Sequence, residues 1–219
     1  MPRESPSADA LPRVDFQANF YTGSWTNDNS EKPTMMKKFS AWLLRRFGWT
    51  LVGELPDVQK CVVIFAPHTS NWDFITMYLF KMSTGARVNF LGKHQIFRWP
   101  FGWFFRALGG IPVVRHEKHN VVQASIATFA EHERVWLAMA PEGTRSKLDH
   151  WRTGFYHIAV GAGVPLQLAF LDTATRTLGL GPLLHLSGDI EQDFAALRAF
   201  YQDKKGFRPE LASDIRPRQ

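Results

Sequence analysis

This 219-residue chain is poor in cysteine and in long apolar runs, and we expect it to have no signal peptide. Cys61 is the single cysteine, which excludes a disulfide within the chain and a metal site built from thiolates, and suits a reducing compartment. No run approaches the roughly 18 consecutive apolar residues of a membrane-spanning helix, and the first residues lack the apolar stretch of a signal peptide. We therefore expect any membrane contact to be peripheral.

Aromatic residues and positive charge are abundant by contrast. The chain contains 18 Phe and 8 Trp, and its formal net charge is +6. Between Lys81 and Lys118 there are seven Lys and Arg residues against the single acid Glu117. The same region holds an aromatic stretch, residues 97–108, which would suit a helix at a membrane interface. Nucleic-acid binders also combine cations with rings, but so many adjacent rings need a core or a bilayer to receive them. We therefore expect a lipid surface as partner and no nucleic acid.

Composition divides the chain into four predicted segments. Residues 1–33, rich in Pro, Ser, Asn and Asp, are expected to form an irregular arm, and residues 34–50 an amphipathic helix. Residues 51–208 would form the main domain, followed by a loose tail over residues 209–219. The chemistry is therefore expected in the main domain.

Short apolar runs alternate with helical patterns along this domain. Such alternation is typical of an α/β fold, here a single layered domain with a largely parallel or mixed sheet flanked by helices. The last strand is expected over residues 184–186. The other strands are expected over residues 50–55, 61–66, 88–91, 111–114, 135–140 and 166–171, and helices over residues 72–82, 120–131, 154–161 and 190–205.

The N-terminal helix has one apolar stripe, formed by Met36, Phe39, Leu43 and Phe47. Basic residues flank the stripe and Trp42 lies near its edge. A short cationic helix with an aromatic edge is typical of helices that lie in the plane of a membrane surface. An ordinary surface helix packed on the domain would show the same stripe.

The stretch from Ala66 to Asp73 joins an uninterrupted apolar strand to a helix, a place where open α/β sheets bind ligands. With His68 in the turn and Asp73 in the first helical turn, the carboxylate can reach back to the imidazole. It would then hold one tautomer and leave the other nitrogen as a general base. Ser70 or Asn71 would cap the helix. The alternative is that His68 only ends the strand and Asp73 is an acid favoured by the helix dipole.

Two further predicted strands end in polar residues, one in Arg115 and the other in Glu142 and Arg145. Because the ends of parallel strands meet at one sheet edge, these groups can converge with His68. Guanidinium groups bind phosphate in a bidentate manner. The set therefore suits a base that deprotonates an alcohol on a phosphate-bearing molecule, which then attacks an activated acyl group. Alternatively, Arg115 covers a strand end, and Glu142 pairs with Arg145 or caps a helix.

Four sequence blocks follow one another along the domain: His68-x4-Asp73, the Gly-initiated apolar strand 109–115 closed by Arg115, Glu142-Gly143-Thr144-Arg145-Ser146 followed by Arg152-x-Gly154, and Val164-Pro165-Leu166. In this order and at these distances they resemble the blocks of the glycerolipid acyltransferases, the family that includes 1-acyl-sn-glycerol-3-phosphate acyltransferase. The resemblance covers residues 68–170, and the third block matches letter for letter.

The resemblance implies an O-acyltransferase that moves a fatty acyl group to a lysophospholipid hydroxyl, converting lysophosphatidic acid to phosphatidic acid. It implies His68 as general base and Asp73 as its orienting partner, with no metal and no cofactor. Acyl-CoA or acyl-carrier protein would be the donor and co-substrate. The acceptor would be bound by Arg115, Glu142, Gly143, Thr144, Arg145 and Arg152, with the arginines on its phosphate.

Three residues depart from the family pattern. Pro67 stands where Asn usually precedes the histidine, Leu168 replaces a proline that is usual in the fourth block, and Arg152 stands where Lys is common. These departures keep open the same chemistry on another lyso-, amino- or glycolipid acceptor. The basic aromatic region alone would also suit a peripheral membrane protein that binds anionic lipid without turnover. In each case we expect a cytoplasmic protein, peripheral on the cytoplasmic face of a membrane.

Overall fold

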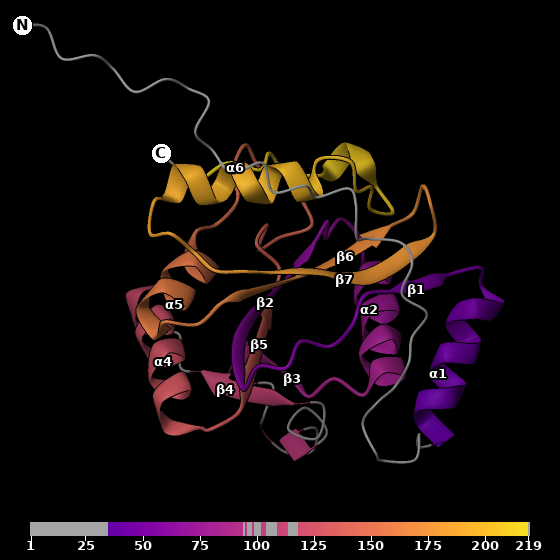
Figure 1. The fold of residues 1–219 in the computed structure, drawn as a ribbon, viewed down its shortest axis with the longest axis horizontal. Coiled ribbons are helices and arrows are strands. Elements are labelled where there is room, and N and C mark those ends of the chain that lie inside the picture. The colour runs from indigo at the N-terminus through magenta and orange to yellow at the C-terminus, as the bar shows by residue number, and fades with distance from the viewer. Residues whose placement is uncertain are drawn as a thin grey trace, which may run out of the picture.

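The computed structural model describes residues 35–93, 95, 98, 102–103, 109–113 and 118–218. They form one mixed sheet with helices on both faces, so the predicted fold class is confirmed (Figure 1). The strands are β1 (Thr50–Val52), β2 (Lys60–Ala66), β3 (Val88–Lys93), β4 (Gly110–Val113), β5 (Val135–Met139), β6 (Leu166–Asp172) and β7 (Thr177–Leu184). The helices are α1 (Met35–Arg46), α2 (Asn71–Thr84), α4 (Lys118–Glu131), α5 (Gly154–Ala162) and α6 (Ile190–Tyr201), with a short 3-10 turn, η2, at Pro209–Leu211.

The sheet has seven strands in the order β1-β7-β6-β2-β5-β3-β4. The β6–β7 pair is antiparallel, and the pairs β1–β7, β2–β5, β2–β6, β3–β4 and β3–β5 are parallel. β2 lies between β5 and β6 with helices over both of its faces. The sequence of such a strand is a continuous apolar run, because neither of its faces is exposed to water. The carboxyl ends of β2 and β5 are therefore neighbours.

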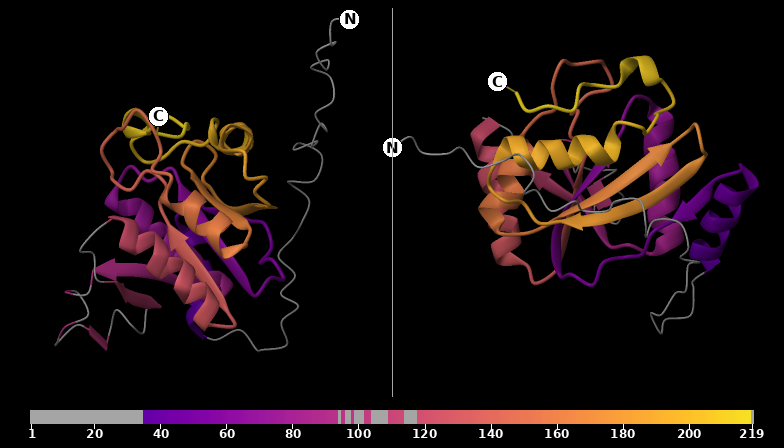
Figure 2. Two further views of the ribbon diagram at one scale, coloured as in Figure 1. Left: turned by 90° about the vertical axis from the view of Figure 1, so that its left-hand side faces the viewer. Right: turned by 45° about the horizontal axis from the view of Figure 1, so that its top comes forward.

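Helices cover the sheet on both sides (Figure 2), and a hydrophobic cluster lies on each face of β2. Val62 and Ile64 pack with side chains of α5 and α6, whereas Val63 and Cys61 pack with α1 and α2. The Cys61 thiol is fully buried, and burial raises its pKa to about 12. A thiol that stays protonated at neutral pH is a core side chain and no nucleophile.

Some predicted boundaries are wrong. The last strand spans Thr177–Leu184 rather than residues 184–186, whereas α1 lies within the predicted segment 34–50 and ends at Arg46. Residues 209–218 are not a loose tail, because they hydrogen-bond to the loop at residues 148–151. The composition of this segment suggested a mobile tail. It could not show these hydrogen bonds, because their partners are distant in the sequence.

Several predictions fall on the undescribed part of the chain. The arm at residues 1–33 lies outside the described residues, and so does most of the aromatic stretch at residues 97–108. Their interpretation stays a prediction. In the part of the chain that is described, no helix is long and apolar enough to cross a bilayer.

Tyr201 ties α6 to the sheet. Its buried hydroxyl lies 3.1 Å from the carbonyl oxygen of Ile64 and 3.0 Å from that of Ala169. We expect Tyr201→Phe to lower the free energy of unfolding by about 1–2 kcal/mol, because it removes a buried hydrogen bond. Urea denaturation measures this. The control is Tyr78→Phe, since the Tyr78 hydroxyl has no hydrogen bond among the described residues. Equal losses in both variants would contradict the assignment.

Candidate active site

The turn between β2 and α2 is fixed by a capping box. Ser70 is the N-cap of α2, and its Oγ accepts a hydrogen bond from the backbone N–H of Trp72 at 3.3 Å. Asp73 lies in the first helical turn and its Oδ2 accepts from the N–H groups of Thr69 at 2.5 Å and of Ser70 at 2.6 Å. The carboxylate thus reaches back into the turn, as the sequence predicts, and Ser70 rather than Asn71 caps the helix.

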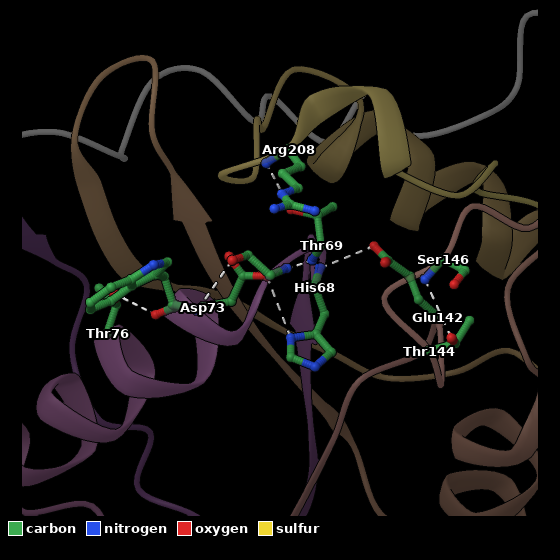
Figure 3. Close-up of polar contacts among 10 residues, drawn as sticks. His68, Thr69, Asp73, Thr76, Glu142, Thr144, Ser146 and Arg208 are labelled. Carbon is green, nitrogen blue, oxygen red and sulfur yellow. Dashed lines mark hydrogen bonds and ion pairs between the residues drawn. The ribbon is translucent and has the colours of Figure 1, made fainter.

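The same carboxylate faces the imidazole of His68. Oδ2 of Asp73 lies 3.5 Å from Nδ1 of His68, and the Asp73 side chain is 0% exposed. This separation is longer than a strong hydrogen bond, but catalytic contacts are often long without substrate. Figure 3 shows the other ring nitrogen, Nε2, on the side away from Asp73. The geometry therefore suits a ring oriented through Nδ1 with Nε2 left available.

Glu142, just beyond the end of β5, approaches the same turn from the neighbouring strand. Its Oε1 accepts a hydrogen bond from the backbone N–H of His68 at 3.1 Å, and the residue is only 1% exposed (Figure 3). The predicted convergence of strand ends is confirmed for these two residues. Burial raises the pKa of Glu142 to about 7, and its Oε2 has no hydrogen-bond partner among the residues that the structure describes. A contact between Glu142 and an acceptor stays a prediction.

Gly143 and Arg152 also come together. Gly143 has a φ of +64°, and a Cβ added there would lie 2.5 Å from Cδ of Arg152. The backbone N–H of Arg152 donates to the carbonyl oxygen of Pro141 at 2.8 Å. Glycine at position 143 therefore allows the exposed Arg152 side chain to lie across the loop.

The remaining predicted binding residues are less constrained. Arg145 is exposed on the same loop, where Oγ1 of Thr144 accepts from the N–H of Ser146 at 3.3 Å. Thr144 therefore has a turn-forming contact. Arg115 lies outside the described residues, so its position stays a prediction. Among the described residues, no group of three or more His, Cys, Asp and Glu side chains is arranged to hold a metal ion.

An apolar cavity of about 300 Å³ reaches His68 from the face of the sheet that α2 covers. Cavities with few polar groups are typical of sites for apolar ligands. At the margin of this one, the half-buried Lys81 donates to the carbonyl oxygen of Val88 at 2.9 Å, and burial lowers its pKa. This cavity is not predicted from the sequence, although alternate residues of β2 and β5 form part of its wall. Much of that wall is formed by Val63, Phe65, Phe74, Met77, Trp136 and Ala138.

The buried Glu142 carboxyl predicts a pH-dependent stability. Its usual pKa is 4.5, so folding takes up a proton between pH 4.5 and about 7. The buried charge therefore costs stability as the pH rises through this window. Glu142→Gln keeps an Oε1 acceptor for His68 and cannot ionise. We expect its free energy of unfolding, relative to the wild type, to rise by about 2 kcal/mol between pH 5 and pH 8.

Urea denaturation at both pH values measures that difference. Glu133→Gln removes a charge from an exposed position and serves as the control. A Glu142→Gln difference that does not change with pH would show that the carboxyl does not titrate in this range.

Known proteins resemble this chain in sequence. The model of the acyltransferase family matches residues 49–167. The 1-acyl-sn-glycerol-3-phosphate acyltransferase of Escherichia coli is 27% identical over 128 residues, which are 55% of this chain and 51% of that protein. That of Salmonella typhimurium is 30% identical over the same shares. The chain spans about half the length of these curated relatives.

A solved structure has the same fold. The 1-acyl-sn-glycerophosphate (LPA) acyltransferase of Thermotoga maritima superposes with a TM-score of 0.56 at 18% identity, covering 76% of each chain. The family model spans more than half of the sequence, from β1 into β6, and includes the His68 turn and the Glu142 loop. The chain therefore belongs to the acyltransferase family.

Proposed function

We propose that this protein is an O-acyltransferase that moves a fatty acyl group from a thioester donor to the free hydroxyl of lysophosphatidic acid, giving phosphatidic acid. The observation that carries the proposal is the position of His68. Its ring faces the buried Asp73 carboxylate at 3.5 Å and lines an apolar cavity. The activity for which the curated relatives are named supports the choice of acceptor.

In the proposed reaction, Nε2 of His68 accepts the proton of the acceptor hydroxyl as its oxygen attacks the thioester carbonyl. The tetrahedral intermediate collapses, the C–S bond breaks, and the imidazolium returns its proton to the leaving thiolate. Asp73 holds the ring through Nδ1 and stabilises its positive charge. The chain therefore supplies a base and needs no covalent acyl-enzyme step.

Guanidinium groups are proposed to bind the phosphate of the acceptor. Arg145 and Arg152 are exposed on and beside the loop that follows β5, next to the end of β2. Arg115 is proposed as the third member on sequence grounds. Guanidinium groups suit the phosphate because they bind its oxygens in pairs. Glu142 is proposed to hold the turn through its hydrogen bond from the N–H of His68. This bond would keep the loop that carries the arginines at a fixed position relative to the base.

The apolar cavity is assigned to the acyl chain of the donor. Most of its lining residues are hydrophobic, and His68 is one of the lining residues. An acyl chain inside it would bring the thioester carbonyl to the imidazole. The thiol portion, from acyl-CoA or acyl-carrier protein, would remain outside. No further cofactor is part of this proposal.

Replacing the proposed base tests the reaction directly. We expect His68→Ala to lower turnover by roughly 10²–10⁴-fold with an unchanged melting temperature, because it removes the general base. The assay is product formation by mass spectrometry. His157→Ala, an exposed histidine on α5, is the matched control. Full activity in the His68 variant would rule out the proposed base.

A panel of acceptors tests the substrate. Purified protein would receive acyl-CoA or acyl-carrier protein together with lysophosphatidic acid, a lyso-aminolipid or a lyso-glycolipid. We expect the fastest turnover with lysophosphatidic acid. Faster turnover with either other acceptor would overturn the acceptor assignment and keep the reaction class. No acylated product with any pair would favour a binding protein without turnover.

We also propose that α1 and α2 form a docking face for an anionic bilayer, peripheral and on the cytoplasmic side. The two helices contact each other on one side of the molecule (Figure 1). Large apolar side chains are exposed on both, including Phe39 at 53%, Trp42 at 58% and Trp72 at 62%. α1 also carries four basic residues and no acidic one. This combination suits an interfacial helix.

Two substitutions on α1 test this face. We expect Phe39→Ser combined with Trp42→Ser to weaken partitioning onto phosphatidylglycerol vesicles by roughly tenfold or more, because buried aromatic area is lost. Vesicle co-sedimentation measures it, and binding should also fall with added salt. Val160→Ser, at an exposed apolar position on α5, is the control. Unchanged binding of the double variant would place the membrane contact elsewhere.

A further inference from the structure

The segment after α6 crosses the His68 turn. The backbone N–H of Arg208 donates to Oγ1 of the buried Thr69 at 3.1 Å, and Figure 3 shows Arg208 beside Thr69. Gly206 packs so closely there that an added Cβ would lie 2.4 Å from Thr69 Oγ1 and 3.4 Å from Cγ of Pro67. Residues 203–216, here called the strap, therefore contact the turn between His68 and Asp73 directly.

The first part of the strap is anchored to the end of β6. The N–H of Lys205 donates to Oδ1 of Asp172 at 3.2 Å, and the N–H of Thr173 donates to the carbonyl oxygen of Lys205 at 2.8 Å. Oγ1 of Thr173 donates to the carbonyl oxygen of Gly206 at 2.9 Å. These contacts hold Gly206 and Arg208 against the turn from a strand that pairs with β2.

The last part of the strap is fixed to the loop that follows Glu142–Ser146. The N–H of Leu148 donates to Oγ of the buried Ser213 at 3.1 Å, and the N–H of Trp151 donates to the carbonyl oxygen of Arg216 at 2.9 Å. The Arg216 guanidinium lies 3.3 Å from Oδ2 of Asp149. The strap therefore bonds to both loops that carry the proposed catalytic and binding residues.

We propose that the strap sets the separation between the His68 turn and the Glu142–Arg152 loop. Thr69 on the turn and Ser213 on the strap are the positioning residues. This inference rests on the proposed function for its kinetic consequence. The strap lies beyond residues 49–167, where the family model matches, whereas Thr69 and Leu148 lie within that range. Its contacts are thus a property of this chain in addition to the family blocks.

The physical reason is that acyl transfer requires the base and the bound acceptor to be held at the right distance and orientation. Misplacement by about 1 Å can cost up to 10²-fold in rate. Among the described residues, a single side-chain hydrogen bond joins the two loops directly, from His68 N–H to Oε1 of Glu142. The strap adds a second connection between the same loops through Thr69 and Ser213, so loss of either hydroxyl should reduce the rate of the chemical step.

Thr69→Val tests the inference, because it removes the acceptor for Arg208 N–H and keeps a branched side chain. We expect kcat to fall about tenfold, with KM for the donor changed less than about twofold, and Thr69→Ser to restore kcat. Ser213→Ala should lower kcat several-fold from the other end of the strap. Thr128→Val is the matched control, since the hydrogen bond of its Oγ1 among the described residues stays within α4, to the carbonyl oxygen of Ala124.

A second readout does not need turnover. The NMR signals of the His68 ring should shift in Thr69→Val and not in Thr69→Ser or Thr128→Val. Wild-type kcat and unchanged His68 signals in Thr69→Val, with only a lower melting temperature, would overturn the strap's positioning role. An inactive wild type would contradict the proposed function, and the ring signals would then decide the role of the strap. If Thr69→Val does not fold, Ser213→Ala decides by the same two measurements.

Discussion

The Oδ2 atom of Asp73 accepts two backbone hydrogen bonds, from Thr69 and Ser70, and also lies 3.5 Å from the His68 ring. The same residue is the third position of α2 and completes its capping box. One buried carboxylate therefore couples the start of a helix to the orientation of an imidazole. Because α2 also forms a wall of the apolar cavity, any displacement of this helix would move the ring and the cavity together.

The strand order of the sheet brings a second buried acid, Glu142, to the His68 turn. β2 and β5 are parallel neighbours, with Ile64 opposite Met139, so their carboxyl ends lie side by side. Glu142 lies three residues beyond the end of β5, close enough to bond the N–H of His68. This contact joins residues 74 positions apart and exists because the strand order places β5 next to β2. The site is thus a consequence of topology as much as of local sequence.

Local signals made the fold and part of the site predictable. Apolar runs and helical spacing gave most of the elements, and the spacing of His68 and Asp73 across a strand–helix junction gave their proximity. The ends of the chain were harder to predict. The strap was expected to be partly helix and partly loose tail, because Gly206, Ser213 and Arg216 have no local pattern that shows what they contact. Their partners, including Thr69 and Leu148, are far away in sequence, so only the folded chain shows them.

Two buried carboxyl groups approach His68, and their charges are coupled to it. Burial raises the pKa of Glu142, the charge of Asp73 raises it further, and the hydrogen bond and charge of His68 lower it. With a pKa of about 7, Glu142 is partly protonated at neutral pH. In the proposed reaction the His68 ring gains a proton when the acceptor hydroxyl loses one. A positive charge on the ring favours the ionised form of Glu142, and the negative charge of that form stabilises the imidazolium in turn. In a buried site this limits the electrostatic cost of forming the imidazolium, because uncompensated charge is expensive at low local dielectric.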